Sequence, residues 1–152
     1  MRIVPDTNVW LSALFWEGES AQIIEIAEDK KFNLDIIVSK EILSEINKVI
    51  NRESKFQGFL ENRRENTEAL FAKILDLSKL VEPIKKLDVV KADPDDNKIL
   101  EAALAGKADY VVSYDPHLTE LREWAEIKII TPTNFLLMWR GLPQNERLRE
   151  TR

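Results

Sequence analysis

The sequence predicts an α/β fold of three layers, in which a mostly parallel central sheet carries helices on both faces. Short β-rich segments alternate along the chain with longer segments that have apolar residues at helical spacing. Such alternation is typical of strands joined by crossover helices. Two segments, DYVV and IKII, are almost continuously apolar, as expected for parallel strands that are covered on both sides. The chain has 152 residues, which is the length of one ordinary domain.

The elements expected in the first half of the chain begin with a strand. Apolar spacing and end signals place a strand at 2–5, a helix at 8–14, a helix at 21–27, a buried strand at 34–38 and a helix from 39 to about 50. Ser39 is a suitable N-cap for the last of these helices, because its hydroxyl can accept a hydrogen bond from the first turn.

The second half is expected to begin with a longer helix. Its elements are a helix at about 56–80, one short strand within 81–90, a helix from 93 to about 106, strands at 110–113 and 127–130, and a helix from 133 to about 139. Pro83 interrupts the β-rich run that gives the short strand. Asp93 is the expected N-cap, and Pro94 the first residue, of the helix that follows. We expect residues 1–140 to form a single domain and residues 141–152 to form a polar C-terminal tail, which is expected to be frayed from Pro143 to Arg152.

The composition limits the chemistry that the chain can perform. There is no cysteine, so thiolate metal sites are excluded, and one histidine cannot form a zinc site of the usual kind. No apolar run approaches the roughly 20 residues of a membrane span, and the N-terminus carries a polar Asp-Thr-Asn where a signal peptide would be apolar. We therefore expect a cytoplasmic protein with no membrane partner. The net charge of −5 means that a polyanion must be bound locally.

Acidic side chains follow the expected strands at the places where ligands bind in parallel sheets. Asp6 comes directly after the first expected strand, and Asp115 follows the fourth. Asp93, Asp95 and Asp96 crowd the start of the helix before that fourth strand. Because ligands bind beyond the carboxyl ends of parallel strands, these three positions are expected to converge at one edge of the sheet. For any one of them alone, the preference of acidic residues for helix N-termini is an equally good explanation.

The helix that begins after Ser39 supplies a fourth candidate. Glu45 lies at the edge of its apolar face, whereas Glu41 points further outward; the face itself consists of Ile42, Leu43, Ile46, Val49 and Ile50. A carboxylate beside a core stripe is costly unless it is paired or bound to a cation. We therefore predict that Glu45 is a ligand and that Glu41 is a solvated charge.

Carboxylates that converge in this way repel one another, and each is expected to have a raised pKa unless a cation is present. Mg²⁺ and Mn²⁺ prefer oxygen ligands and relieve the repulsion. Two such ions about 4 Å apart can activate a water and stabilise the leaving oxygen of a phosphodiester. Without cysteine and with a single histidine, metal-activated hydrolysis is the most economical chemistry for this chain.

Four segments of the sequence resemble the PIN-domain family, in family order. They are IVPDTNVWLSAL, VSKEILSEINKVI, DPDDNKILEAALAGKADYVVSYDPHL and IKIITPTNFL, and together they cover most of the chain. The likeness is greatest to the prokaryotic PIN proteins of toxin–antitoxin pairs, the VapC type. It implies a PIN-like α/β/α fold and a ribonuclease that cleaves RNA with Mg²⁺ or Mn²⁺. It also implies an antitoxin protein as partner, and a homodimer or higher homo-oligomer.

The resemblance assigns roles to individual residues. The acidic quartet of the family, with its catalytic and metal-binding roles, falls on Asp6, Glu45, Asp96 and Asp115. Auxiliary polar positions fall on Thr7, Asn8, Asp93 and Ser113. Helix capping explains the acidic side chain of Asp93 equally well.

Two positions depart from the family pattern. Many relatives carry a further acidic residue two positions after the last aspartate, and this chain has His117 there. The missing fifth carboxylate weakens the case for a second tightly held metal, and we expect His117 to be a surface residue. Pro5 stands where a large aliphatic residue is commoner, and it suits the end of a strand.

Several aromatic and basic residues have an ordinary structural explanation. Trp10, Phe15 and Trp16 are expected in the core or in a dimer contact. The pairs Arg63–Arg64 and Lys85–Lys86 are expected to be solvated charges, and they are the nearest candidates for steering RNA toward an acidic site.

Two other functions remain open. A haloacid-dehalogenase-like phosphatase also begins with a strand followed by aspartate, but it needs a second aspartate two residues later, where this chain has Asn8. The main alternative is a catalytically weak PIN-fold module that binds nucleic acid or has a regulatory role. All four quartet positions are acidic, which argues against a degenerate site.

Overall fold

The structure is a computed structural model that describes residues 1–150, and within them six strands form one sheet. The strands are β1 (Arg2–Pro5), β2 (Asp35–Ser39), β3 (Ser78–Val81), β4 (Tyr110–Val112), β5 (Glu123–Trp124) and β6 (Ile127–Ile130). Their order is β3-β2-β1-β4-β6-β5, and among these pairs only β5 and β6 are antiparallel. The predicted α/β fold with a mostly parallel sheet is therefore confirmed.

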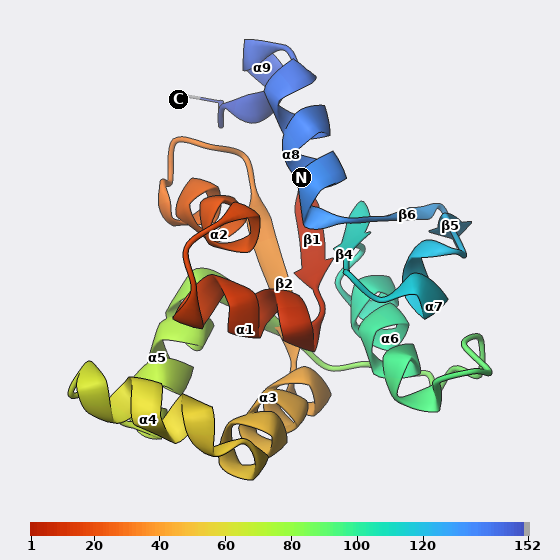
Figure 1. Cartoon of the computed structure of the whole chain (residues 1–152). Coiled ribbons are helices and arrows are strands. Elements are labelled where there is room, and N and C mark those ends of the chain that lie inside the picture. Colours follow the sequence, from red (N-terminus) through yellow and green to blue (C-terminus); the bar gives the residue numbers. More distant parts are fainter. Residues whose placement is uncertain (151–152) are drawn as a thin grey trace.

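Helices cover both faces of this sheet (Figure 1). On one face, α1 (Thr7–Phe15) packs against α2 (Glu19–Glu28), which also contacts α8 (Pro132–Gly141). The chain moves outward from β1 to β3 and then returns to β4 on the other side of β1, so right-handed crossovers place α6 (Asn97–Ala105) on the opposite face. The other helices are α3 (Lys40–Arg52), α4 (Ser54–Asn62), α5 (Thr67–Leu77), α7 (Pro116–Thr119), α9 (Gln144–Arg147) and the 3-10 helix η1 (Pro94–Asp96).

The predicted long helix at 56–80 is wrong, because the chain forms α4 and α5 there. The two helices are separated at Arg64, whose φ is 56°, and α5 restarts at Asn66, whose side chain accepts the N–H of Ala69 at 2.8 Å. The run RREN between the two helices has no apolar residue, so no core contact holds it helical. The strand predicted within 81–90 is also misplaced, since β3 forms at Ser78–Val81 by pairing with β2.

The expectation of a frayed C-terminal tail is wrong for residues 144–149, and its last two residues, 151–152, lie outside the described part of the chain. α9 follows α8 closely, and Leu148 forms an antiparallel bridge with Phe32. Arg149 donates to the carbonyl oxygen of Lys30 at 3.1 Å and to Oδ1 of Asp35 at 2.7 Å. These partners lie more than a hundred residues earlier in the chain, so local composition does not reveal them.

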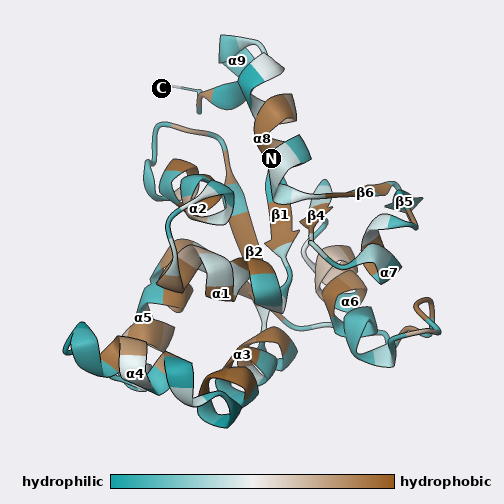
Figure 2. Cartoon of the chain, in the orientation of Figure 1, coloured by the Kyte–Doolittle hydropathy of each residue, from teal (hydrophilic) through white to brown (hydrophobic). Residues whose placement is uncertain are grey.

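The core lies around β1 and β2, whose ribbons are coloured as hydrophobic in Figure 2. Trp10 and Phe15 are buried, as predicted. Trp16 is 45% exposed and meets the two phenylalanine rings of α4 edge to face. The predicted homodimer stays a prediction, and Trp16 is the exposed aromatic residue of this group that such a contact would cover.

The guanidinium of Arg63, predicted to be a solvated charge, makes two hydrogen bonds within the protein. It donates to the carbonyl oxygen of Leu14 at 2.6 Å and to that of Phe15 at 3.1 Å. It therefore ties the end of α1 to α4 and satisfies carbonyls that have no partner within the helix. Lys85 and Lys86 are exposed, as predicted.

Gly106 ends α6 against the sheet, and a side chain has no room there. A Cβ at this position would lie 2.6 Å from Cγ2 of Ile37 in β2. Ile37 is 1% exposed, so it cannot move aside without disturbing the core. We predict that Gly106→Ala lowers the free energy of unfolding by about 1–3 kcal/mol, the usual cost of overpacking a core.

Gly58→Ala is the matched control for this substitution. Gly58 lies inside α4 with nothing within 4 Å of an added Cβ, so alanine is expected to raise the free energy of unfolding by about 0.5–1 kcal/mol. Urea denaturation of both variants measures the two effects. Equal stability of Gly106→Ala and the wild type would contradict the tight packing of α6 on β2.

Candidate active site

The predicted acidic residues line one cleft at the carboxyl ends of β1 and β4. These neighbouring strands mark the place where the chain reverses its direction across the sheet, and ligands bind there in α/β folds. The cleft has a volume of about 220 Å³, and its lining includes Asp6, Glu45, Asp96, Asp115, Thr7, Asn8, Asp93, Arg52 and Lys98. A larger hollow of about 410 Å³ opens around Met1 and Asp109, at the other end of these strands, away from the predicted residues.

Asp6 is buried where β1 passes into α1. Its Oδ1 accepts the N–H of Val9 at 2.9 Å and so caps α1, while Oδ2 accepts the hydroxyl of Ser113. Burial raises the pKa of Asp6 to about 6, and the charge of Asp115 acts in the same direction, whereas these hydrogen bonds act in the opposite one. A buried carboxylate held by two donors has a fixed direction, as a metal ligand requires.

Ser113 connects two of the acidic residues. Its buried hydroxyl donates to Asp6 and accepts the N–H of Asp115 at 2.9 Å. Ser113 therefore fixes the carboxylate of Asp6 relative to the backbone of Asp115, although 107 residues separate Asp6 from Ser113.

We predict that Ser113→Ala lowers the free energy of unfolding by about 1–3 kcal/mol, because it leaves buried polar partners unsatisfied. We also expect divalent-metal binding to weaken by about 10-fold, since Asp6 loses the donor that orients it. Urea denaturation and calorimetric titration measure the two effects.

Ser20→Ala is the control for Ser113→Ala. Ser20 is also buried, and its hydroxyl bonds to that of Tyr114 at 2.9 Å, with neither residue in the lining of the cleft. This variant is expected to lose stability without losing metal affinity. If Ser113→Ala binds metal as tightly as the wild type, the orienting role of Ser113 is wrong.

Asp96 and Asp115 share the middle of the cleft. Burial raises the pKa of Asp96 to about 8, and contact with Asp115 and the charges of Asp93 and Asp6 act in the same direction. Partial burial acts upward on Asp115 as well, but its contact with Asp96 and the N–H of His117 hold the pKa of Asp115 below its ordinary value. The pair therefore shares one proton near neutral pH when no metal is bound.

One oxygen of Asp96 lacks a hydrogen-bond partner. Within the described part of the chain, its Oδ2 is buried and unpaired, whereas buried polar atoms normally have a partner. Without a cation, the repulsion at this oxygen is relieved only by keeping a proton on the Asp96–Asp115 pair, and a divalent cation would take the place of that proton. The residues present therefore fit a hard divalent ion held by carboxylates.

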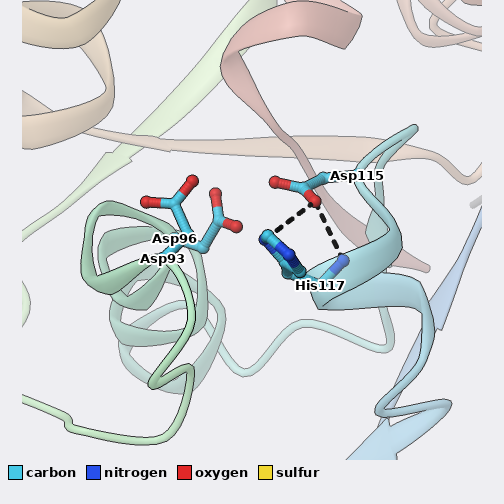
Figure 3. Close-up of side chains that lie close together, drawn as sticks. All are labelled: Asp93, Asp96, Asp115 and His117. Carbon is cyan, nitrogen blue, oxygen red and sulfur yellow. Dashed lines mark hydrogen bonds and ion pairs between the residues drawn. The ribbon is translucent and has the colours of Figure 1, made fainter.

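Asp93 and His117 extend the acidic group outward (Figure 3). One ligand atom from each of Asp93, Asp96, Asp115 and His117 lies within 4.8 Å of the others. The side chain of Asp93 also accepts the N–H of Asp95 at 3.2 Å, so it caps η1, as the capping explanation predicts. The side chain of His117 is 48% exposed, but its ring points into the group, with Nδ1 at 3.6 Å from Oδ1 of Asp115.

Glu45 is paired with a lysine that the sequence pattern does not reveal. Nζ of Lys98 lies 3.3 Å from Oε2 of Glu45 and 3.9 Å from Oδ1 of Asp95. Glu45 is half-buried and Glu41 is exposed, as their places on the helix face predict. The only local signal for Lys98 is its spacing of three residues from Asp95, because Glu45 is 53 residues away.

Thr7 and Asn8 line the cleft from the first turn of α1. Thr7 is half-buried and Asn8 is exposed. Both therefore present polar side chains to a molecule in the cleft, and their auxiliary role stays a prediction.

Comparison with known proteins decides the family. The family model described as PIN domain matches residues 2–117, which is most of the chain. This chain belongs to the PIN-domain family. PIN domains are nucleases, so the family match excludes the phosphatase alternative.

A solved structure shows the same PIN fold. One chain of the crystal structure of VapBC2 from Rickettsia felis bound to a DNA fragment from their promoter is similar, with a TM-score of 0.57. The sequence identity is 15%, and the match covers 85% of this PIN domain chain and 97% of that chain. None of the curated proteins compared with the sequence matches it. In residues 1–150, no helix combines the length and apolar character needed to span a membrane.

Proposed function

We propose that this PIN protein is a divalent-metal-dependent ribonuclease, which hydrolyses RNA phosphodiester bonds in the cleft lined by Asp6, Glu45, Asp96 and Asp115. The buried, unpaired Oδ2 of Asp96 beside Asp115 is the observation that carries this proposal. A site that binds RNA without a metal ion would not be expected to contain an unpaired carboxylate oxygen, because a carboxylate repels phosphate.

Asp6, Asp96 and Asp115 would hold the cation, which is Mg²⁺ or Mn²⁺ because the ligands are carboxylates. When bound, it supplies Lewis-acid activation of the phosphate and of the attacking water. Ser113 keeps Asp6 and Asp115 in register during the reaction. The protein's own part is thus to fix the carboxylates before substrate arrives, which removes a reorganisation cost from the reaction.

Two basic residues in the cleft lining would bind the RNA backbone. Lys98 and Arg52 both line the cleft, in a chain whose net charge is −5. A phosphodiester is attracted only locally, so these two side chains, with the hydroxyl of Thr7 and the amide of Asn8, would position it. The Lys98–Glu45 pair leaves further protons of the ammonium available to a phosphate oxygen.

The biological role that we propose is that of a toxin held in check by an antitoxin protein. The fold likeness to a chain of the VapBC2 structure supports this role. Induced expression should arrest growth for the wild type and not for Asp6→Asn. Growth arrest by both proteins would mean that toxicity does not depend on the proposed nuclease site.

The activity is tested by incubating a panel of single-stranded and structured RNAs with Mn²⁺, Mg²⁺ or EDTA. We expect cleavage with either metal, none with EDTA and none by Asp6→Asn, in which asparagine still caps α1. Glu41→Gln, an exposed substitution outside the lining of the cleft, should cleave like the wild type. A folded, metal-loaded protein that cleaves no RNA would favour the nucleic-acid-binding module instead.

A further inference from the structure

The carboxylates of the cleft belong to two overlapping groups. The inner group is Asp6 with Asp115, which Ser113 links, and Asp96, whose pKa the charge of Asp6 helps to raise. The outer group is Asp93 with Asp96, Asp115 and His117, whose ligand atoms converge within 4.8 Å. Figure 3 shows the four residues of the outer group, two of which, Asp96 and Asp115, also belong to the inner group.

We propose that the outer group is a second divalent-metal position in which His117 is a direct ligand, and that its imidazole makes this position prefer Mn²⁺ over Mg²⁺. This inference rests on the proposed function, because Asp96 and Asp115 are shared with the proposed catalytic cation. It assigns a role to the position where the sequence departs from the family pattern.

Two carboxylates of the outer group, Asp115 and Asp93, are held in place by short, local contacts. The N–H of His117 bonds to Oδ1 of Asp115 at 2.9 Å, which joins the start of α7 to the carboxylate. Asp93 is fixed as the cap of η1. Asn97 secures the preceding loop, since its side-chain oxygen accepts the N–H groups of Val89 and Val90, both at 2.9 Å. These two carboxylates therefore need little rearrangement to bind a cation.

The charges of the outer group also favour a cation. Three carboxylates converge there, and Lys98, the lysine in the lining of the cleft, pairs with Glu45 and Asp95 instead. An imidazole in place of a further carboxylate removes one unit of negative charge and supplies a nitrogen donor.

The nitrogen donor decides the metal preference. Mg²⁺ takes oxygen ligands almost exclusively and loses its waters reluctantly. Imidazole suits transition metals, and Mn²⁺ accepts both carboxylate oxygen and imidazole nitrogen. A set of three carboxylates and one imidazole therefore favours Mn²⁺ over Mg²⁺ at the outer position, while the inner, all-oxygen group accepts either ion.

Electron spin-echo spectroscopy of the Mn²⁺-loaded full chain, prepared without a histidine tag, tests the ligand directly. The chain has one histidine, so an imidazole nitrogen coupled to Mn²⁺ can only belong to His117. We expect this coupling in the wild type and its loss in His117→Ala. Bound Mn²⁺ without nitrogen coupling in the wild type would mean that His117 is only an ion-pair partner of Asp115, and the proposal would be overturned.

Calorimetric titration tests the metal preference. His117→Ala should weaken the outer Mn²⁺ site by about 10-fold or more and leave Mg²⁺ binding unchanged. His117→Asp should restore two-site binding with a preference shifted toward Mg²⁺. Equal Mn²⁺ affinities of the wild type and His117→Ala would overturn the proposal.

The RNA cleavage assay separates this inference from the proposed function. Nitrogen coupling without RNA cleavage would support the outer metal position and contradict the ribonuclease activity. RNA cleavage without nitrogen coupling would support the ribonuclease activity and contradict the outer metal position.

Discussion

Asp96→Asn is expected to lower the rate of RNA cleavage by about 100-fold or more and, at the same time, to raise the stability of the metal-free protein. The loss of cleavage follows because Asp96 would be a ligand of the catalytic cation, and an amide is a weak substitute for a carboxylate. The gain in stability follows from the same half-buried position, where Oδ2 of Asp96 lies out of contact with solvent. When the cation is absent, the carboxylate of Asp96 lowers the stability of the folded protein, because it lies close to other carboxylates.

The size of the gain follows from the pKa of Asp96, which burial, with Asp115, Asp93 and Asp6, raises to about 8. Near pH 7 the folded, metal-free protein must keep a proton on this residue that the unfolded chain releases. Asparagine is neutral at every pH and can donate to Asp115. After allowance for solvent screening, we expect Asp96→Asn to raise the free energy of unfolding by about 1–2 kcal/mol in EDTA.

Urea denaturation in EDTA and RNA cleavage in Mn²⁺ measure the two effects on one preparation. Asp95→Asn is the neighbouring control, because the side chain of Asp95 is 82% exposed and its substitution should change stability by less than about 0.5 kcal/mol. Joint loss of cleavage and stability in Asp96→Asn would indicate damage to the fold. Full cleavage would remove Asp96 from the metal site.

The sequence predicts the parts of the site that follow from local patterns. Asp6 comes directly after β1 and Asp115 comes shortly after β4, and parallel strands bring such residues to one edge, where both line the cleft. Glu45 lines the cleft, as its place beside the apolar face of α3 predicts, but its role as a metal ligand stays a prediction. In each case the signal lies within a few residues of the side chain concerned.

The sequence does not predict features that depend on distant partners. The Lys98–Glu45 pair joins residues 53 apart, and the contact of Arg149 with Asp35 joins residues 114 apart. The start of β3 is missed for the same reason, because pairing with β2 overrides the helical pattern of residues 56–80. The convergence of His117 with Asp93 likewise depends on how two loops meet.

Above about pH 5, the metal-free protein is expected to lose stability as the pH rises, and a divalent cation should reverse the loss. Burial raises the pKa values of Asp6 to about 6 and of Asp96 to about 8, both above the ordinary value of 3.8. Between the ordinary pKa of 3.8 and these raised values, the folded state binds more protons than the unfolded state. The free energy of unfolding therefore falls with increasing pH in this range. Asp115 has a lowered pKa, so its contribution is already complete above its ordinary value and is lost only in more acidic solution.

The expected loss between about pH 5 and pH 8 is about 2–4 kcal/mol after screening and coupling are allowed for, or about 5–15 °C in Tm. Mg²⁺ at 100 times its dissociation constant would add about 2.7 kcal/mol, and more at pH 8 than at pH 5, because at low pH it must displace protons from Asp6 and Asp96. Differential scanning calorimetry across this pH range measures how Tm changes with pH in Mg²⁺ and in EDTA.

Asp96→Asn should flatten the dependence of Tm on pH in EDTA, because one of the two titrating groups is gone. A wild-type profile that rises with pH in EDTA would show that the cleft carries no such cost, and a Tm unaffected by Mg²⁺ would show that it binds no cation.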